Sequence, residues 1–134
     1  LGQWSLCCVF HVEHPFSKRR SLSPRDILKE RLIAFSPDTP QGKALGQWSA
    51  EAHWPIDSKI EVRSGQVACA LAATGAGIAV VDSLTAHAWA HPALAFRPIT
   101  QAPTFNAYEI RNANVPPSLI SNSLMTRIKE KLNG

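Results

Sequence analysis

Three short stretches of the chain combine hydroxyl, amide and carboxylate side chains with turn-forming residues. They are Ser36–Gly42, Arg63–Gln66 and Asp82–Ser83, and each directly follows a short apolar segment. Hydroxyls and free backbone N–H groups at the start of a helix bind carboxylates and other anions. A carboxylate such as Asp82 can pair with a cationic group of a ligand. These residue types therefore predict reversible binding of a small charged or polar molecule.

Helix capping is a second explanation for the same side chains. Thr39, Ser64 and Ser83 are residue types that commonly cap helices, and Asp82 can cap the helix that follows it. A capping side chain satisfies backbone N–H groups of its own chain and needs no ligand. Both explanations stay open for each residue, and the convergence of three such turns is what favours binding.

Cys7 and Cys8 near His11 are the residues that come closest to a nucleophile with its base. On an extended strand, residues four apart are separated by about 13 Å, which is too far for a hydrogen bond. The chain also contains no glycine-rich phosphate loop and no GxSxG motif. We therefore expect no enzymatic activity and no catalytic residue.

Two groups of cysteine and histidine residues raise the possibility of a zinc site. The groups are Cys7, Cys8, His11 and His14, and His87 with His91. A strand would spread the first group apart, and Pro92 indicates that His91 lies beyond the end of its helix. We expect ordinary histidines, no metal site and no cofactor.

Strand-like and helix-like segments alternate along most of the chain. Strands are expected at Leu6–His11, Leu32–Phe35, Ile60–Val62, Gly77–Val81, Leu94–Ile99 and Phe105–Ile110. Helices are expected at Arg25–Lys29, from Thr39-Pro40 to Ala52, at Gln66–Thr74, at Ser83–Trp89 and after Pro116-Pro117. This alternation predicts an α/β fold with a mostly parallel sheet. Ligands of such sheets bind beyond the carboxyl ends of the strands, so the three polar turns are expected to share one edge.

The composition predicts a cytoplasmic protein without a membrane segment. The chain has 134 residues and a net charge of +4. Its one dense basic run, Lys18–Arg20, has no interleaved aromatic residues, which favours a solvated loop over direct nucleic-acid contact. No segment approaches the roughly 20 apolar residues of a membrane span, and the start lacks the basic segment followed by a long apolar run that is typical of a signal peptide. Because the chain begins at Leu1 rather than at Met, we expect it to be a fragment or a processed product of a longer chain.

The cysteines predict free thiols rather than disulfide bonds. The chain has three of them, Cys7, Cys8 and Cys69, and neighbouring residues on a strand point to opposite faces. We expect these thiols to be buried or half-buried.

Several segments resemble the effector-binding domain of LysR-type transcription regulators, a bacterial family. SLCCVFHVEHPFSKRR resembles the strand and turn that begin the second effector-binding subdomain, and ERLIAFSPDTPQGKAL resembles the next strand and the effector-cleft turn. IEVRSGQVACALAATGAGIAVVDSLTA resembles the strand–helix–GxGI–strand unit of the family. LAFRPITQAPTFNAYEIRNANVPPS resembles the return crossover, so the resemblance covers essentially the whole chain.

The resemblance implies a type II periplasmic-binding-protein-like fold, with an effector held between two α/β lobes. Residues 1–99 would be the second subdomain, essentially complete, and residues 100–134 the returning strand and last helix of the first. The winged helix-turn-helix that binds DNA would lie outside this chain. The intact regulator is expected to be a homo-oligomer that contacts DNA only through that domain and does not contact a membrane. The residues expected to bind the effector are Ser36, Thr39, Gln41, Ser64, Gln66 and Asp82.

Two further interpretations concern the ligand and the class of protein. FSPDTPQG and GIAVVDSLTA resemble the branch of the family that senses lysine, octopine and nopaline, which implies an amino acid or opine effector. The alternative is a stand-alone solute-binding protein of the periplasmic type. Such a protein would share the fold but would need an export signal and a complete first lobe.

Overall fold

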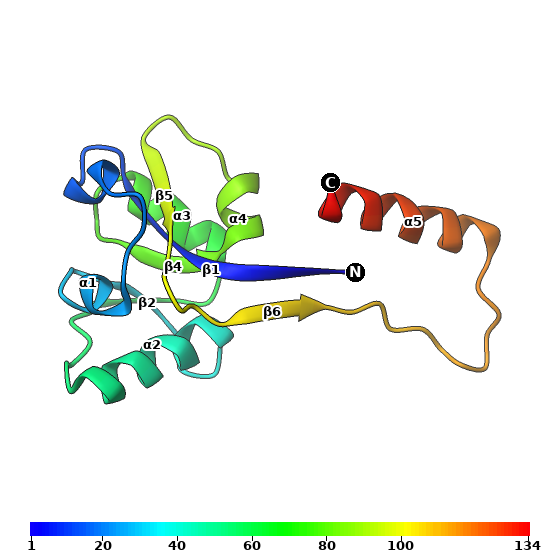
Figure 1. The fold of residues 1–134 in the computed structure, drawn as a ribbon, viewed down its shortest axis with the longest axis horizontal. Coiled ribbons are helices and arrows are strands. Elements are labelled where there is room, and N and C mark those ends of the chain that lie inside the picture. The colour runs from blue at the N-terminus through cyan, green and yellow to red at the C-terminus, as the bar shows by residue number, and fades with distance from the viewer. The chain divides into compact units, whose positions relative to one another are not determined.

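The computed structural model describes all 134 residues, which form two compact units (Figure 1). One unit is Ser5–Pro103, and the other combines Leu1–Trp4 with Thr104–Gly134. The elements are β1 (Gly2–His11), the 3₁₀ helix η1 (Pro15–Lys18), α1 (Pro24–Leu28), β2 (Ile33–Phe35), α2 (Pro40–Ala52), β3 (Ile60–Val62), α3 (Gly65–Ala73), β4 (Ala79–Asp82), α4 (Ser83–Ala88), β5 (Leu94–Pro98), β6 (Thr104–Ala107) and α5 (Leu119–Asn133).

The sheet of the larger unit has one strand that runs against the others. β2 pairs with β3 in parallel, with Phe35 opposite Val62. A parallel bridge between Leu32 and Ile78 connects β2 to the start of β4. β1 lies between β4 and β5 and is antiparallel to both. Strands β2, β3, β4 and β5 therefore run in one direction and β1 in the other.

Alternating side chains of the strands make two apolar layers. Cys7 and Val9 of β1 belong to the same buried cluster as Ala68 and Cys69 of α3. The alternate residues of β1, Leu6, Cys8 and Phe10, are also buried, but they point to the opposite face of the sheet. On that face α1 packs against α2, and α2 packs against β2 and β4. A sheet covered on both faces accounts for the nearly continuous apolar sequence of β4.

The turn after β1 is more ordered than the basic loop predicted from sequence. The Ser17 hydroxyl donates hydrogen bonds to the carbonyl oxygens of Val12 (2.6 Å) and His14 (2.5 Å). His14 Nδ1 accepts from the Phe16 N–H, and Phe16 is buried. These contacts close the short helix η1. Helix η1 is held by local polar hydrogen bonds and not by a periodic row of apolar residues. The sequence pattern therefore did not predict this helix.

In the smaller unit, the first residues of the chain lie beside β6. The amino group of Leu1 donates to the carbonyl oxygen of Ala107 at 2.8 Å, and Asn133 Nδ2 donates to the carbonyl oxygen of Leu1 at 2.9 Å. β6 ends at Ala107, so the predicted strand Phe105–Ile110 is too long at its carboxyl end.

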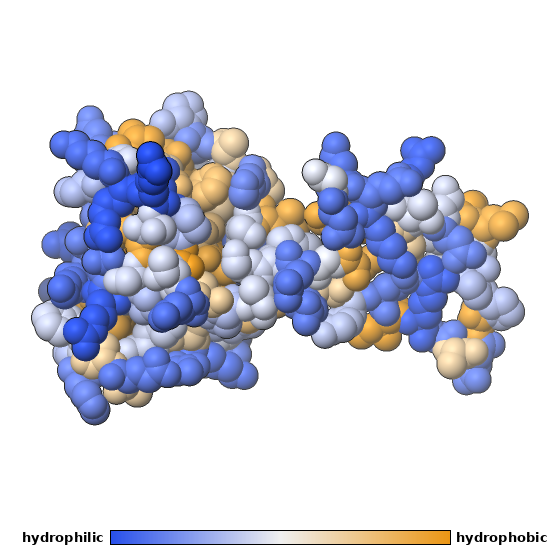
Figure 2. All heavy atoms as spheres, in the orientation of Figure 1, coloured by the Kyte–Doolittle hydropathy of each residue, from blue (hydrophilic) through white to orange (hydrophobic).

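Helix α5 buries none of its residues. Leu119 and Ile120 are 87% and 82% exposed, and Ile110 before the helix is 93% exposed. Figure 2 shows separate apolar patches among hydrophilic surface on the part of the chain that carries α5. No helix of the chain combines the length and the apolar character that a membrane crossing requires.

Candidate functional site

The three polar turns follow β2, β3 and β4, whose carboxyl ends lie at one edge of the sheet. The backbone N–H of Ser36 donates to the carbonyl oxygen of Val62 (3.1 Å), which joins the first turn to the end of β3. β4 runs in the same direction as β2, since Leu32 and Ile78 form a parallel bridge. We call this edge the strand-end rim and define it as Ser36–Gly42, Arg63–Gln66 and Asp82–Ser83.

Ser36, Asp38 and Arg63 form a hydrogen-bonded cluster on the rim. Arg63 Nη2 donates to Asp38 Oδ2 at 2.8 Å, and Nη1 donates to Asp38 Oδ1 at 3.2 Å. The hydroxyl of Ser36 donates to Asp38 Oδ1 at 2.6 Å and accepts from Arg63 Nη1 at 3.0 Å. Ser36 is the only buried polar residue of the chain. The cluster ties the β2–α2 turn to the β3–α3 turn.

The charges of this cluster stabilise each other. Hydrogen bonds from Arg63 and then from Ser36 lower the pKa of Asp38 from its ordinary value of 3.8 to about 2. The hydrogen bond and the charge of Asp38 raise the pKa of Arg63. Both side chains are more than half exposed. The rim thus presents a permanent ion pair to solvent near neutral pH.

Thr39 caps helix α2. Its Oγ1 accepts from the N–H of Gly42 at 3.0 Å and donates to the carbonyl oxygen of Ser36 at 2.6 Å. A Cβ atom at Gly42 would collide with that same carbonyl oxygen, so this position requires glycine. Gln41 lies between them in the first turn of α2 and is half-buried. The structure therefore assigns the hydroxyl of Thr39 a capping function.

Ser64 differs from Thr39 because its side chain makes no capping hydrogen bond. It occupies the N-cap position of α3, and both Ser64 and Gln66 are exposed. A Cβ atom at Gly65 would lie 2.8 Å from Cγ2 of Thr85, so the start of α3 packs closely against α4. This close contact brings the second turn next to the third. The hydroxyl of Ser64 remains available at the rim.

Asp82 is the N-cap residue of α4. Its Oδ1 accepts from the N–H of Thr85 at 2.8 Å, and its Oδ2 accepts from Thr85 Oγ1 at 2.7 Å. Of the two interpretations made from the sequence, capping is the one that the observed hydrogen bonds fit. Each carboxylate oxygen still has a second lone pair, so the negative charge of Asp82 remains part of the rim.

The sequence pattern predicted that the three turns share one edge of the sheet. It did not predict two side chains that organise this edge. Asp38 and Arg63 lie within these turns, yet neither was predicted to be a site residue. A signal was present, since an acidic residue and a basic residue follow two strands that neighbour each other in the sheet. Their pairing depends on the register of β2 and β3, which the sequence does not specify.

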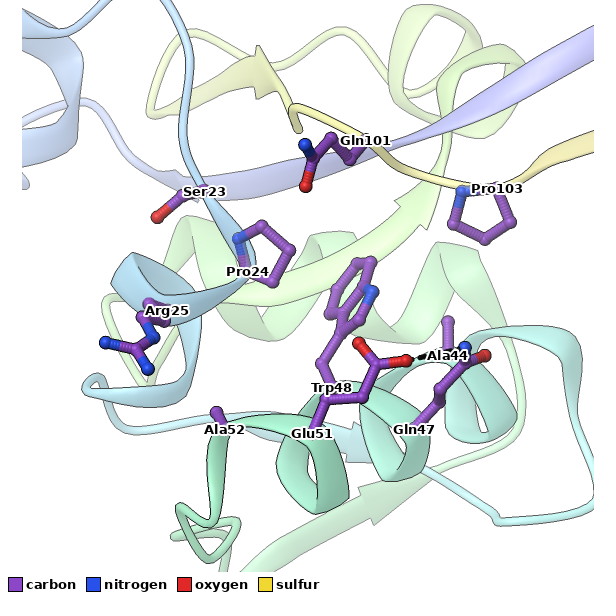
Figure 3. Close-up of a pocket in the computed structure, with 10 residues that line it drawn as sticks. All are labelled: Ser23, Pro24, Arg25, Ala44, Gln47, Trp48, Glu51, Ala52, Gln101 and Pro103. Atoms are coloured by element: carbon purple, nitrogen blue, oxygen red, sulfur yellow. Dashed lines mark hydrogen bonds between the residues drawn. The ribbon is translucent and has the colours of Figure 1, made fainter.

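A pocket of about 550 Å³ lies away from the rim, on the flank of α2 (Figure 3). The indole of Trp48 forms one wall, and Gln47 Nε2 donates to Glu51 Oε1 at 2.9 Å. The start of α1 and residues 101 and 103 complete the lining. None of the six residues predicted from sequence lines this pocket.

The three cysteines are buried and free. Burial, and to a smaller extent the charge of Asp82, raises the pKa of Cys7 to about 12 and that of Cys69 to about 11. Burial also raises the pKa of Cys8. Such thiols stay protonated near neutral pH, which makes them poor nucleophiles and poor metal ligands.

Comparisons with known proteins place the chain in one family. The model of the LysR substrate binding domain matches residues 1–133. The transcriptional activator protein LysR of Escherichia coli K12 is 30% identical over 113 residues, which cover 84% of this chain and 36% of that protein. The chain thus spans about a third of the length of this curated relative.

Two solved structures have the same fold. The regulatory domain of CcmR from Synechocystis PCC6803, in complex with 2-PG, matches with a TM-score of 0.68 and 15% identity over 98% of this chain and 64% of that one. The effector binding domain of QuiR, in complex with shikimate, matches with a TM-score of 0.63 and 18% identity over the same shares of the two chains. The fold is therefore α/β, as the sequence pattern predicted, and type II periplasmic-binding-protein-like, as the resemblance implied. The chain belongs to the LysR substrate-binding domain family.

Proposed function

We propose that this chain is the ligand-sensing part of a LysR-type transcription regulator and that its effector binds at the strand-end rim. One observation carries the proposal: in a member of this family, three polar turns end at a single edge of the sheet. The free hydroxyl of Ser64 and the exposed Arg63–Asp38 pair offer hydrogen bonds and charge at that edge. The curated relative is a transcription regulator, which favours this function over catalysis and over a stand-alone solute-binding protein.

The effector class that we propose is a basic amino acid or an opine. Asp82 would attract an ammonium or guanidinium group through its charge. Polar groups of the effector would be bound by Ser36, Thr39, Gln41, Ser64 and Gln66. This assignment also rests on the resemblance of FSPDTPQG and GIAVVDSLTA to the branch that senses lysine, octopine and nopaline.

We further propose that residues 1–99 form the second lobe of the sensor and that residues 100–134 belong to the first lobe. The exposed apolar residues of α5 support this arrangement, because an amphipathic helix of this kind normally packs on a sheet. In the intact cytoplasmic regulator, which we expect to be a homo-oligomer, DNA would be bound by a domain outside this chain.

The mechanism that follows is a shift between two states rather than a reaction. An effector that binds one arrangement of the lobes better than another shifts the population toward the first. The same difference in affinity is the largest effect that the effector can have on DNA binding.

Isothermal titration calorimetry of the intact two-lobed sensor with L-lysine, L-arginine, octopine and nopaline tests the proposed effector class. We expect saturable binding of at least one of them, weakened by Ser64→Ala. The matched control is Ser123→Ala, which removes an exposed hydroxyl of α5 and should leave the affinity unchanged. If none of the four compounds binds saturably, the effector class is wrong.

A further inference from the structure

We infer that Arg63 recognises a carboxylate of the effector and that Asp38 is the internal carboxylate which the effector displaces. The inference rests on the proposed function, because it concerns the same rim. It adds Arg63 as a residue that selects ligands, and it requires that the effector carry a carboxylate.

The geometry of the Arg63–Asp38 pair is that of a carboxylate binding site already occupied. Two nitrogens of the planar guanidinium face the two oxygens of Asp38, at 2.8 and 3.2 Å. Any carboxylate binds a guanidinium best in this two-point arrangement. A ligand carboxylate can therefore take the position of the Asp38 carboxylate without a change in the position of Arg63.

The exposure of the pair makes such an exchange feasible. The side chains of Arg63 and Asp38 are 68% and 63% exposed. Exposed ion pairs add little to stability, because water solvates both partners when they separate. Asp38 is ionised throughout the neutral range, since its pKa is about 2. After displacement it would be solvated as a free carboxylate.

Ser36 would hold Arg63 in place during the exchange. It is buried at the base of the cluster, and its Oγ accepts from Arg63 Nη1 at 3.0 Å. The hydroxyl hydrogen of Ser36 is now donated to Asp38 Oδ1 at 2.6 Å. Once Asp38 leaves, the same hydrogen can be donated to the ligand carboxylate. The site would thus offer either carboxylate the two guanidinium N–H groups and this hydroxyl.

A purely structural function of the pair predicts a different result. If the pair only joins the two turns, then Asp38→Asn weakens the join and leaves ligand affinity unchanged or lower. If Asp38 competes with the ligand, then Asp38→Asn removes the competitor and raises the affinity. The two explanations therefore differ in the sign of one measurable change.

The test compares amino acids with their decarboxylated counterparts on the intact two-lobed sensor, by calorimetry. We expect L-arginine to bind at least about tenfold more tightly than agmatine, and L-lysine at least about tenfold more tightly than cadaverine. In Arg63→Gln this preference should disappear, and in Asp38→Asn the affinity for the amino acid should rise severalfold. The control is Arg19→Gln, which removes the partly exposed Arg19–Asp26 pair (3.1 Å) outside the rim and should change neither value.

Equal binding of the two members of each pair, or a preference that survives in Arg63→Gln, overturns the inference. A separate measurement covers the case in which no amino acid binds and the proposed effector class fails. The protein is then titrated with sodium acetate and, as a control, with sodium chloride. The Nε–Hε NMR signal of Arg63 is followed in both titrations. A shift with acetate alone supports the displacement of Asp38, and no shift contradicts it.

Discussion

Arg63 extends from the end of β3 to the turn after β2, where its guanidinium binds both carboxylate oxygens of Asp38. The two residues are far apart in the sequence and meet because β2 and β3 pair in parallel, with Phe35 opposite Val62. Arg63 directly follows β3, and Asp38 lies in the turn that follows β2. Their ion pair is therefore a direct consequence of the sheet register.

The first prediction concerns the titration of Asp38. Its pKa is lowered from 3.8 to about 2, so the interaction stabilises the folded chain above about pH 4 and is lost as the pH falls toward 2. In Arg63→Gln, the carboxyl ¹³C titration midpoint of Asp38 should move up toward its ordinary value. Asp26 is the internal control, because hydrogen bonds led by the backbone of Ser23 lower its pKa to about 2 independently of Arg63. An unchanged midpoint for Asp38 would show that the pair does not persist in solution.

The second prediction compares two glycines of α2. Gly42→Ala places a methyl group against the carbonyl oxygen of Ser36 and should destabilise the chain by about 1–3 kcal/mol. At Gly46 an added Cβ would have no atom within 4 Å, so Gly46→Ala should stabilise the helix by about 0.5–1 kcal/mol. Urea denaturation measures both changes. Equal effects of the two substitutions would contradict the close contact between the first turn and α2.

The third prediction separates the two functions considered for Asp82. Asparagine caps helices about as well as aspartate, so Asp82→Asn should keep the stability of α4, whereas Asp82→Ala should lose about 1 kcal/mol. Asp82→Asn nevertheless removes the charge that we propose attracts a basic group. The affinity for L-lysine should therefore fall in Asp82→Asn while the denaturation midpoint stays constant. Unchanged affinity would leave Asp82 with capping alone.

The fourth prediction concerns thiol reactivity. Because burial raises the pKa of Cys7 to about 12 and that of Cys69 to about 11, little thiolate exists at a mildly alkaline pH. Iodoacetamide should modify the native chain far more slowly than the chain in urea, as followed by mass spectrometry. Rapid modification of the native chain would mean that β1 or α3 opens readily.

Local features of this fold follow closely from the sequence. Helix α2 begins at Thr39-Pro40 and α4 begins after Asp82, because capping depends only on residues within one turn. The central strands were likewise visible, since a short apolar run such as that of β4 is typical of a buried strand. The alternation of strands and helices was enough to bring the three polar turns to one edge.

Features that depend on distant residues could not be predicted in the same way. The antiparallel direction of β1 is set by its pairing with β4 and β5, and the sequence of a buried strand is compatible with either direction. The sequence also did not predict whether the side chain of an N-cap residue makes a capping hydrogen bond. Thr39 and Ser64 are both hydroxyl residues at the N-cap of a helix, yet only Thr39 makes the capping bond.

Mapping by NMR would show directly whether the effector binds at the strand-end rim. A ¹H–¹⁵N spectrum of the intact two-lobed sensor is recorded during titration with L-lysine and with octopine. If the effector binds at the strand-end rim, the saturable shifts should centre on Ser36, Ser64 and Asp82. Shifts that centre instead on Trp48 and Gln101, in the pocket on the flank of α2, would contradict binding at the rim.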